Sequence, residues 1–187
     1  MESKKHKYLK QIAQIKLHYM GYKVIYPESY AGYVNGHLDA VGARLVGYPQ
    51  KAETTGIEVK VSRADFFGEK QKFVGERGNR FEEKELGVNY RYFLTPPNLI
   101  DKSELYNGWG LMTFNGKRVR VVVEAPRKEV DNTVVLFYLA DVAHYLYHRE
   151  VTGLVDGYNF VTYKDLEIEN NLMEERWEEV KDDSKNN

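Results

Sequence analysis

The sequence contains no cysteine, which excludes disulfide bonds, a thiol nucleophile and any thiolate metal site. It also lacks a long hydrophobic run. The longest one, Val134 to Ala140, is far shorter than the ~20 residues that cross a bilayer. The first ten residues are charged and carry no apolar signal core. We therefore expect a cytoplasmic protein that has no membrane partner.

Several catalytic signatures are absent as well. The sequence has no glycine-rich phosphate loop ending in Lys-Ser or Lys-Thr, no His-Glu-x-x-His pair and no Gly-x-Ser-x-Gly elbow. Five histidines without a cysteine also argue against a structural zinc site. These absences leave carboxylates and lysines as the main candidates for chemistry.

What the sequence does contain is enough apolar material for one domain. The chain has 187 residues, of which 42% are hydrophobic and 29% charged. Residues 1–128 hold 22 Lys and Arg against 14 Asp and Glu, whereas residues 129–187 hold 5 against 14. The basic part suits a polyanion such as nucleic acid, although both parts can equally be solvated faces.

The spacing of apolar residues predicts an α/β protein. A first helix runs from Lys4 to Met20, with Ser3 as its N-cap and Gly21 as its stop signal. The elements expected after it are strands at Tyr22–Tyr26, His37–Val46 and Gly56–Val61, a turn at Tyr48–Thr55, a helix from Ser62 to about Val74, and a strand at Tyr90–Leu94. A hairpin follows around Asn115-Gly116. Two further helices are expected, at Val134–Arg149 and Asp165–Val180.

Polar residues on two of these strands form the main candidate site. Asp39 is expected in one strand, and Glu58 and Lys60 in the next, two residues apart and therefore on one face. If the strands form a hairpin, the two carboxylates meet and suit a hard divalent cation, Mg²⁺ or Mn²⁺. Lys60 then lies beside that ion, where its ammonium can hold an attacking water or stabilise negative charge. The alternative is an exposed strand face with a cross-strand ion pair.

This pattern resembles the PD-(D/E)XK nuclease superfamily, with Leu38 in place of the proline of the family motif. A longer resemblance is to the MmcB-like DNA-repair proteins of that superfamily and covers roughly residues 5–128. It rests on Ile57–Phe66, Tyr92–Pro97, Gly110–Met112 and Val122–Pro126. The resemblance implies a restriction-endonuclease-like αβββαβ core with a mixed sheet, an added hairpin and C-terminal helices. It also implies Asp39, Glu58 and Lys60 as catalytic residues, and Asp39, Glu58 and the Val59 carbonyl as metal ligands.

Many members of the superfamily place a further acid on the first helix, and this chain has none there after Glu2. Gln14 is the nearest candidate for a weak substitute. Asp65 fits a helix cap better than a ligand. Candidate nucleic-acid contacts are His37, Arg63, Lys70, Gln71 and Lys72, each of which can equally be a surface residue.

Two hypotheses of function follow. In the first, residues 1–128 form a Mg²⁺-dependent nuclease that hydrolyses DNA phosphodiester bonds in repair, recombination or phage DNA processing. Residues 129–187 form an acidic helical extension packed on the same domain. In the second, the missing acid indicates a catalytically weak nucleic-acid-binding or protein-interaction module on a nuclease scaffold. The apolar segment Val134–Arg149 makes a homodimer or a protein partner plausible.

Overall fold

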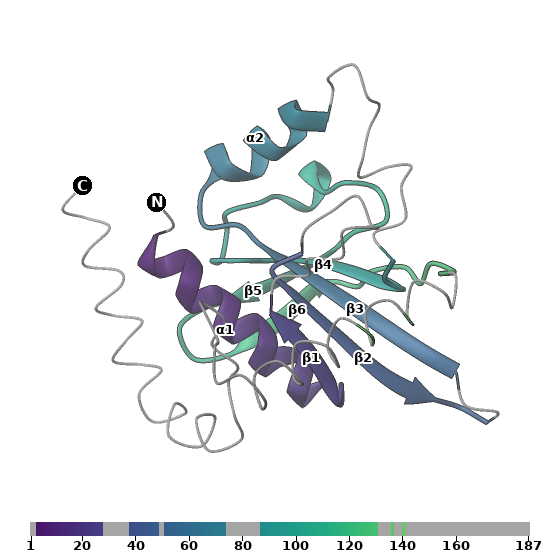
Figure 1. Cartoon of the computed structure of the whole chain (residues 1–187). Helices are drawn as coiled ribbons and strands as arrows, with labels where there is room; N and C mark the ends of the chain where they lie inside the picture. Colours follow the sequence, from purple (N-terminus) through teal and green to yellow (C-terminus); the bar gives the residue numbers. More distant parts are fainter. Residues whose placement is uncertain are drawn as a thin grey trace.

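The computed structural model describes residues 3–27, 38–48, 51–73 and 87–130, together with Leu136 and Ala140; for Pro27 and residues 69–73 it describes the backbone alone. Two α-helices, a short 3₁₀ helix and six strands make up this part of the chain (Figure 1). In chain order they are α1 (Lys4–Tyr19), β1 (Val24–Pro27), β2 (Ala40–Val46), β3 (Lys51–Val59), α2 (Arg63–Phe73), β4 (Tyr90–Thr95), η1 (Lys102–Glu104), β5 (Gly110–Phe114) and β6 (Val119–Val123).

The structure confirms the start and stop signals predicted for the first helix, α1. The Ser3 hydroxyl accepts a hydrogen bond from the His6 backbone N–H at 3.2 Å, which satisfies one of the free donors of the first turn. At the other end, Gly21 takes a φ of 85°, a left-handed conformation that a residue without a Cβ adopts at little cost. The chain then turns directly into β1.

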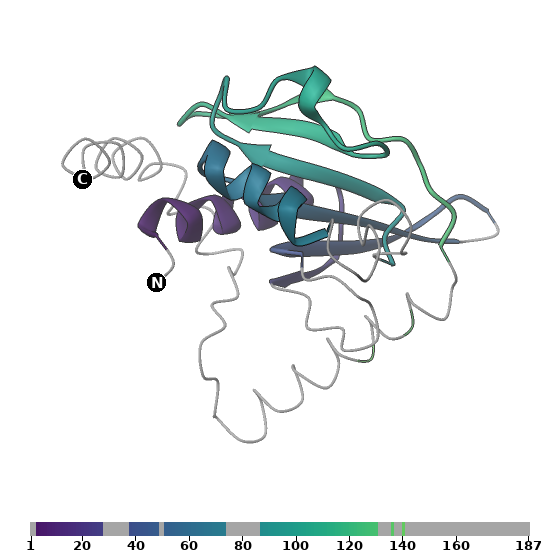
Figure 2. The same cartoon turned by 90° about the horizontal axis from the view of Figure 1, so that it is seen from above.

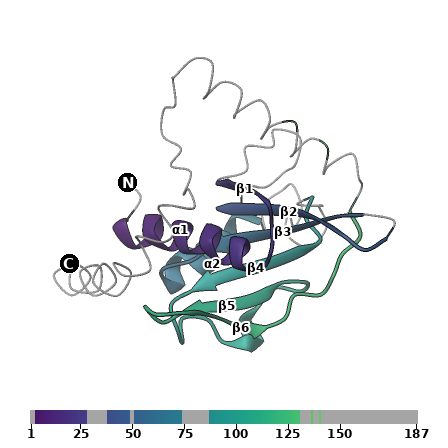
Figure 3. The same ribbon diagram turned by 90° about the horizontal axis from the view of Figure 1, so that it is seen from below.

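The six strands form one mixed sheet in the order β1-β2-β3-β4-β5-β6 (Figure 3). β1 pairs antiparallel with β2, and β2 pairs antiparallel with β3. Helix α2 then carries the chain back, so that β4 pairs parallel with β3, and β5 in turn pairs parallel with β4. β6 closes the sheet as the predicted hairpin partner of β5. The carboxyl ends of β3, β4 and β5 therefore lie at the same edge of the sheet.

The two helices cover opposite faces of the sheet, as the view from above shows (Figure 2). One core cluster joins the apolar face of α1 to side chains such as Ile57, Val59 and Met112. The other joins Phe66 of α2 to Phe93 and its neighbours. The Phe93 ring stacks on Trp109 with centroids 4.3 Å apart. The strand side chains alternate between the two clusters, as the period of two requires.

The prediction of a turn from Tyr48 to Thr55 is wrong, because β3 begins at Lys51. The residues before Gly56 are mostly polar, so their pattern did not predict a buried strand. Its polar groups find partners elsewhere in the fold: Thr54 bonds the Asn89 side chain, and the Thr55 hydroxyl lies 2.5 Å from that of Tyr22. A buried hydroxyl with such a partner costs little.

The prediction that Asp39 lies inside a strand is also wrong, because β2 begins one residue later, at Ala40. As a consequence Leu38 does not share a face with Ala40. Leu38 packs in the α2-side cluster and Ala40 in the α1-side cluster. Gly56 leaves room for the Leu38 side chain, because a Cβ at position 56 would collide with it.

The structure confirms an α/β fold with a six-stranded mixed sheet and an N-terminal helix. Of the predicted helix Val134–Arg149 it describes Leu136 and Ala140, which are both helical and exposed. The predicted helix Asp165–Val180 lies outside the described residues, and the proposed boundary near residue 128 stays a prediction. Within the described ranges, no helix has the length and apolarity that crossing a membrane requires.

Candidate active site

Asp39 and Glu58 are neighbours in the strand register, where β2 begins and β3 ends. Ala40 pairs with Ile57 in the antiparallel register, so the next residues outward are Asp39 on one side and Glu58 on the other. Both residues are 9% exposed, so their carboxylates lie largely out of water. The hairpin that the sequence predicted for these two residues is thus present, with Asp39 just outside it.

The Asp39 carboxylate accepts a backbone hydrogen bond that β2 does not accept at the end of β3. Because β2 starts at Ala40, the backbone N–H of Val59 has no carbonyl opposite it in the sheet. One Asp39 oxygen, Oδ2, accepts that hydrogen bond at 2.7 Å. The other oxygen, Oδ1, pairs with the Lys10 ammonium of α1 at 3.1 Å. These contacts fix the carboxylate in one orientation, which suits a ligand or a catalytic acid.

The Lys60 ammonium contacts two carboxylates, those of Glu58 and Asp65. Its Nζ donates to Glu58 Oε1 at 2.8 Å and lies 3.8 Å from Asp65 Oδ1. Lys60 is 3% exposed, and its backbone N–H continues the parallel ladder by donating to the Leu94 carbonyl. Asp65 lies in the first turn of α2. Ser62 caps this helix, because its hydroxyl accepts a hydrogen bond from the Asp65 N–H at 3.1 Å. The site thus gathers side chains from both faces of the sheet.

Sequence reasoning missed two site residues on α1. His6 Nε2 lies 3.3 Å from the Val59 carbonyl oxygen and 3.7 Å from Asp39 Oδ2. Lys10, one helical turn further, pairs with the same aspartate. The available signal was their spacing: residues 6, 10 and 14 share one helix face and interrupt its apolar pattern with polar side chains. The search for an acid on this helix overlooked both.

Gln14, the sequence-based candidate on that face, is buried at 7% exposure two turns beyond His6. The Val59 carbonyl is at the site and faces His6, as just described. Considering only the described ranges, no three His, Asp or Glu side chains are gathered as a ready metal site. Two carboxylates and a main-chain carbonyl are nevertheless the oxygen donors that a hard divalent ion takes, with water for the rest. The donor chemistry therefore fits such an ion.

Arg63 has a structural role that the sequence did not reveal. Its guanidinium contacts both Glu104 oxygens, at 2.5 and 3.0 Å, and lies over the Phe67 ring. The hydrogen bond with Arg63 lowers the pKa of Glu104. This pair ties the start of α2 to η1. The nucleic-acid contact predicted for Arg63 is not tested by these interactions and stays a prediction. His37 lies outside the described residues, as do the side chains of Lys70, Gln71 and Lys72, so their predicted contacts stay predictions too.

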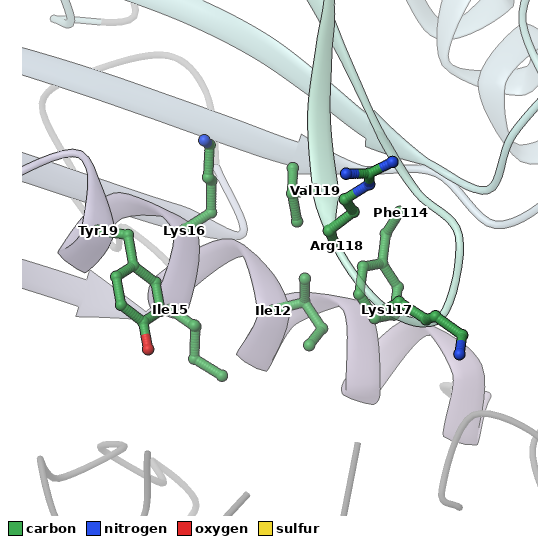
Figure 4. A pocket seen from close by; sticks show the side chains of 8 residues that line it. All are labelled: Ile12, Ile15, Lys16, Tyr19, Phe114, Lys117, Arg118 and Val119. Carbon is green, nitrogen blue, oxygen red and sulfur yellow. The ribbon is translucent and has the colours of Figure 1, made fainter. Parts of the chain in front are cut away.

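A basic groove lies at the same sheet edge, between α1 and the β5–β6 turn (Figure 4). Its volume is about 290 Å³, with an apolar floor that includes Ile12 and Val119. Lys16, Lys117 and Arg118 also line it, and among the described residues no acidic side chain does. Tyr8, two residues after His6 along α1, contacts Phe114 in the groove, with ring centroids 6.0 Å apart. The groove and the candidate site therefore share α1.

The fold has a known counterpart of undetermined activity. A solved structure of a protein of unknown function from Silicibacter pomeroyi superposes with a TM-score of 0.57 at 16% sequence identity. The match covers 85% of this chain and 100% of that one. At this identity the likeness concerns the fold alone. No family model matches the sequence, and no curated protein matches it either.

Proposed function

We propose that this protein is a metal-dependent nuclease that hydrolyses DNA phosphodiester bonds, in repair, recombination or phage DNA processing. The observation that carries the proposal is the β2–β3 register, by which Asp39 is next to Glu58, together with the 2.8 Å contact between Lys60 and Glu58. The surrounding fold runs from a helix through three antiparallel strands to a second helix and a parallel strand. This is the element order of the nuclease core that the sequence resembles.

Asp39, Glu58 and the Val59 carbonyl are the residues that would hold Mg²⁺ or Mn²⁺. A bound divalent ion supplies Lewis-acid polarisation of the scissile phosphate and a water of lowered pKa. The protein's own contribution is positional and electrostatic. The Val59 N–H and Lys10 hold Asp39 in place, and Glu58 holds the Lys60 ammonium.

Lys60 then orients the water that attacks phosphorus, or stabilises the negative charge that develops on the phosphoryl oxygens. Hydrolysis forms one bond from the water oxygen to phosphorus and breaks one P–O ester bond, and the leaving oxygen takes up a proton. Lys16, Lys117 and Arg118 offer the adjacent DNA backbone a cationic groove.

A second candidate function is a DNA-binding or protein-interaction module without catalysis. The specific observation in its favour is that each carboxylate already has a lysine partner, Lys10 for Asp39 and Lys60 for Glu58. An ion would have to compete with both ammonium groups. Among the described Asp, Glu and Lys side chains, Asp65 is a third carboxylate beside two lysines, and this excess of acid favours ion entry and therefore the nuclease.

The test is cleavage of a labelled panel of single-stranded, duplex, nicked and branched DNA with Mg²⁺ or Mn²⁺. EDTA is the metal control, and Glu58→Ala and Lys60→Ala are the site controls. The proposal expects cleavage that EDTA and both substitutions abolish. Binding without cleavage on every substrate would favour the second candidate. A parallel RNA panel identifies which nucleic acid is the substrate.

A further inference from the structure

We infer that His6 is a metal ligand of this site and takes the place of the carboxylate that the first helix lacks. The inference rests on the proposed function and extends it to a residue on α1. His6 reaches the site because Ser3 caps the helix at its first turn, which places the imidazole against the end of β3.

Two distances carry the argument. His6 Nε2 is 3.3 Å from the Val59 carbonyl oxygen and 3.7 Å from Asp39 Oδ2. Adjacent ligands of an octahedral ion with bonds near 2.1 Å lie ~3 Å apart, so these separations need little adjustment. Three donor atoms from three segments of the chain thus approach one another, and two of them are already among the expected ligands.

His6 Nε2 and the Val59 oxygen face each other at hydrogen-bond distance. A divalent ion bound there would take one donor from each, since imidazole nitrogen and carbonyl oxygen both bind such ions. The set would then be two side chains and a carbonyl, with Glu58 as a further candidate ligand. A set with two such side chains agrees with the lack of a group of three His, Asp or Glu residues in the described part of the chain.

An imidazole ligand changes which ion the site prefers. Carboxylate, carbonyl and water oxygens suit Mg²⁺ and Mn²⁺ alike, whereas imidazole favours transition metals over Mg²⁺. We therefore expect Mn²⁺ to bind more tightly than Mg²⁺ by at least tenfold. His6→Ala removes most of that difference and lowers Mn²⁺ affinity about tenfold or more, as loss of a ligand does.

The experiment measures Mn²⁺ binding to the full chain by calorimetry, and nitrogen coupling to bound Mn²⁺ by pulsed electron paramagnetic resonance. His18→Ala is the matched control, because His18 stands near the other end of the same helix. The inference expects a directly bound imidazole nitrogen in the wild type and in His18→Ala, but not in His6→Ala. Tight Mn²⁺ binding without nitrogen coupling would overturn the role of His6 and leave the metal site standing. Absence of Mn²⁺ binding in the wild type, with and without DNA, would instead overturn the proposed function together with the inference.

Discussion

Charged residues lie at both ends of the β2–β3 hairpin, but the two ends differ in how their charges are paired. At the turn end Arg44 faces Glu53 across the ladder, and its Nε and Nη2 both donate to Glu53 Oε1, at 2.9 and 2.7 Å. The guanidinium also lies over the Tyr22 ring and donates to the Met20 carbonyl. This network ties the end of α1 to the sheet with one cation for one carboxylate.

The open end of the same hairpin is not balanced in this way. Asp39 pairs with Lys10 and lies near His6, while Glu58 and Asp65 share Lys60. Counted over the described Asp, Glu and Lys side chains alone, three carboxylates stand against two ammonium groups, an excess of one negative charge that would attract a divalent ion. Burial of charge therefore does not itself mark a functional site. The imbalance and the convergence of several chain segments distinguish the open end from the turn end.

The largest expected effect comes from Lys60→Met, which keeps the length of the side chain and removes its charge. We expect cleavage to fall by about 10²–10³-fold or more, the range for loss of one positioned electrostatic group. Circular dichroism and thermal unfolding check that the variant is folded. Cleavage at the wild-type rate by the folded variant would contradict the mechanism.

The matched change at the turn end is Arg44→Met. It leaves Glu53 buried without its cation, so we expect the free energy of unfolding to fall by about 2–3 kcal/mol. Urea unfolding measures this loss. Cleavage per folded molecule should stay at the wild-type level, because Arg44 contacts no site residue in the described structure. A specific loss of activity in a stable Arg44→Met protein would show that the two ends are coupled.

A smaller effect is expected from Lys10→Met, because Lys10 competes with a metal ion for Asp39. Removing this competitor should strengthen Mn²⁺ binding about tenfold, a change of ~1.4 kcal/mol. Calorimetric titration measures it, with Lys16→Met as a control on the same helix. Weaker Mn²⁺ binding in Lys10→Met would mean that Lys10 supports the ion site and does not oppose it.

The smallest effect concerns the groove. Replacing Lys117 and Arg118 by alanine should weaken DNA binding several-fold and reduce its salt dependence by up to about 2 in the logarithmic slope. Fluorescence anisotropy over a range of salt concentrations measures both quantities. Arg120→Ala, on the exposed side of β6, is the control. An unchanged salt slope in the double variant would place the DNA elsewhere.

Local sequence signals predicted much of the framework correctly. The cap at Ser3, the stop at Gly21 and the hairpin at Asn115-Gly116 depend on residues close together in the chain, so the sequence displays them. The meeting of Glu58 and Lys60 follows from strand alternation in the same way. The proximity of Asp39 to them required only the correct strand pairing.

The errors concern residues whose partners lie far along the chain. Thr54 and Thr55 are polar in sequence, but Asn89 and Tyr22 make them suitable for a buried strand. Burial also raises the pKa of Tyr22, which keeps its hydroxyl protonated beside Thr55. His6 and Lys10 belong to the site only because α1 crosses the end of β3. That crossing is a property of helix packing, which hydrophobic spacing alone does not fix.

The most direct test of the central claim compares two buried glutamates of one strand. Glu58→Gln and Glu53→Gln change the same atoms in residues that are 9% and 8% exposed. The measurement is metal-dependent cleavage of labelled DNA per folded molecule. The account predicts cleavage by the wild type and by Glu53→Gln, and its loss in Glu58→Gln. Equal activity in both variants, or no metal-dependent cleavage by the wild type on any substrate, would contradict it.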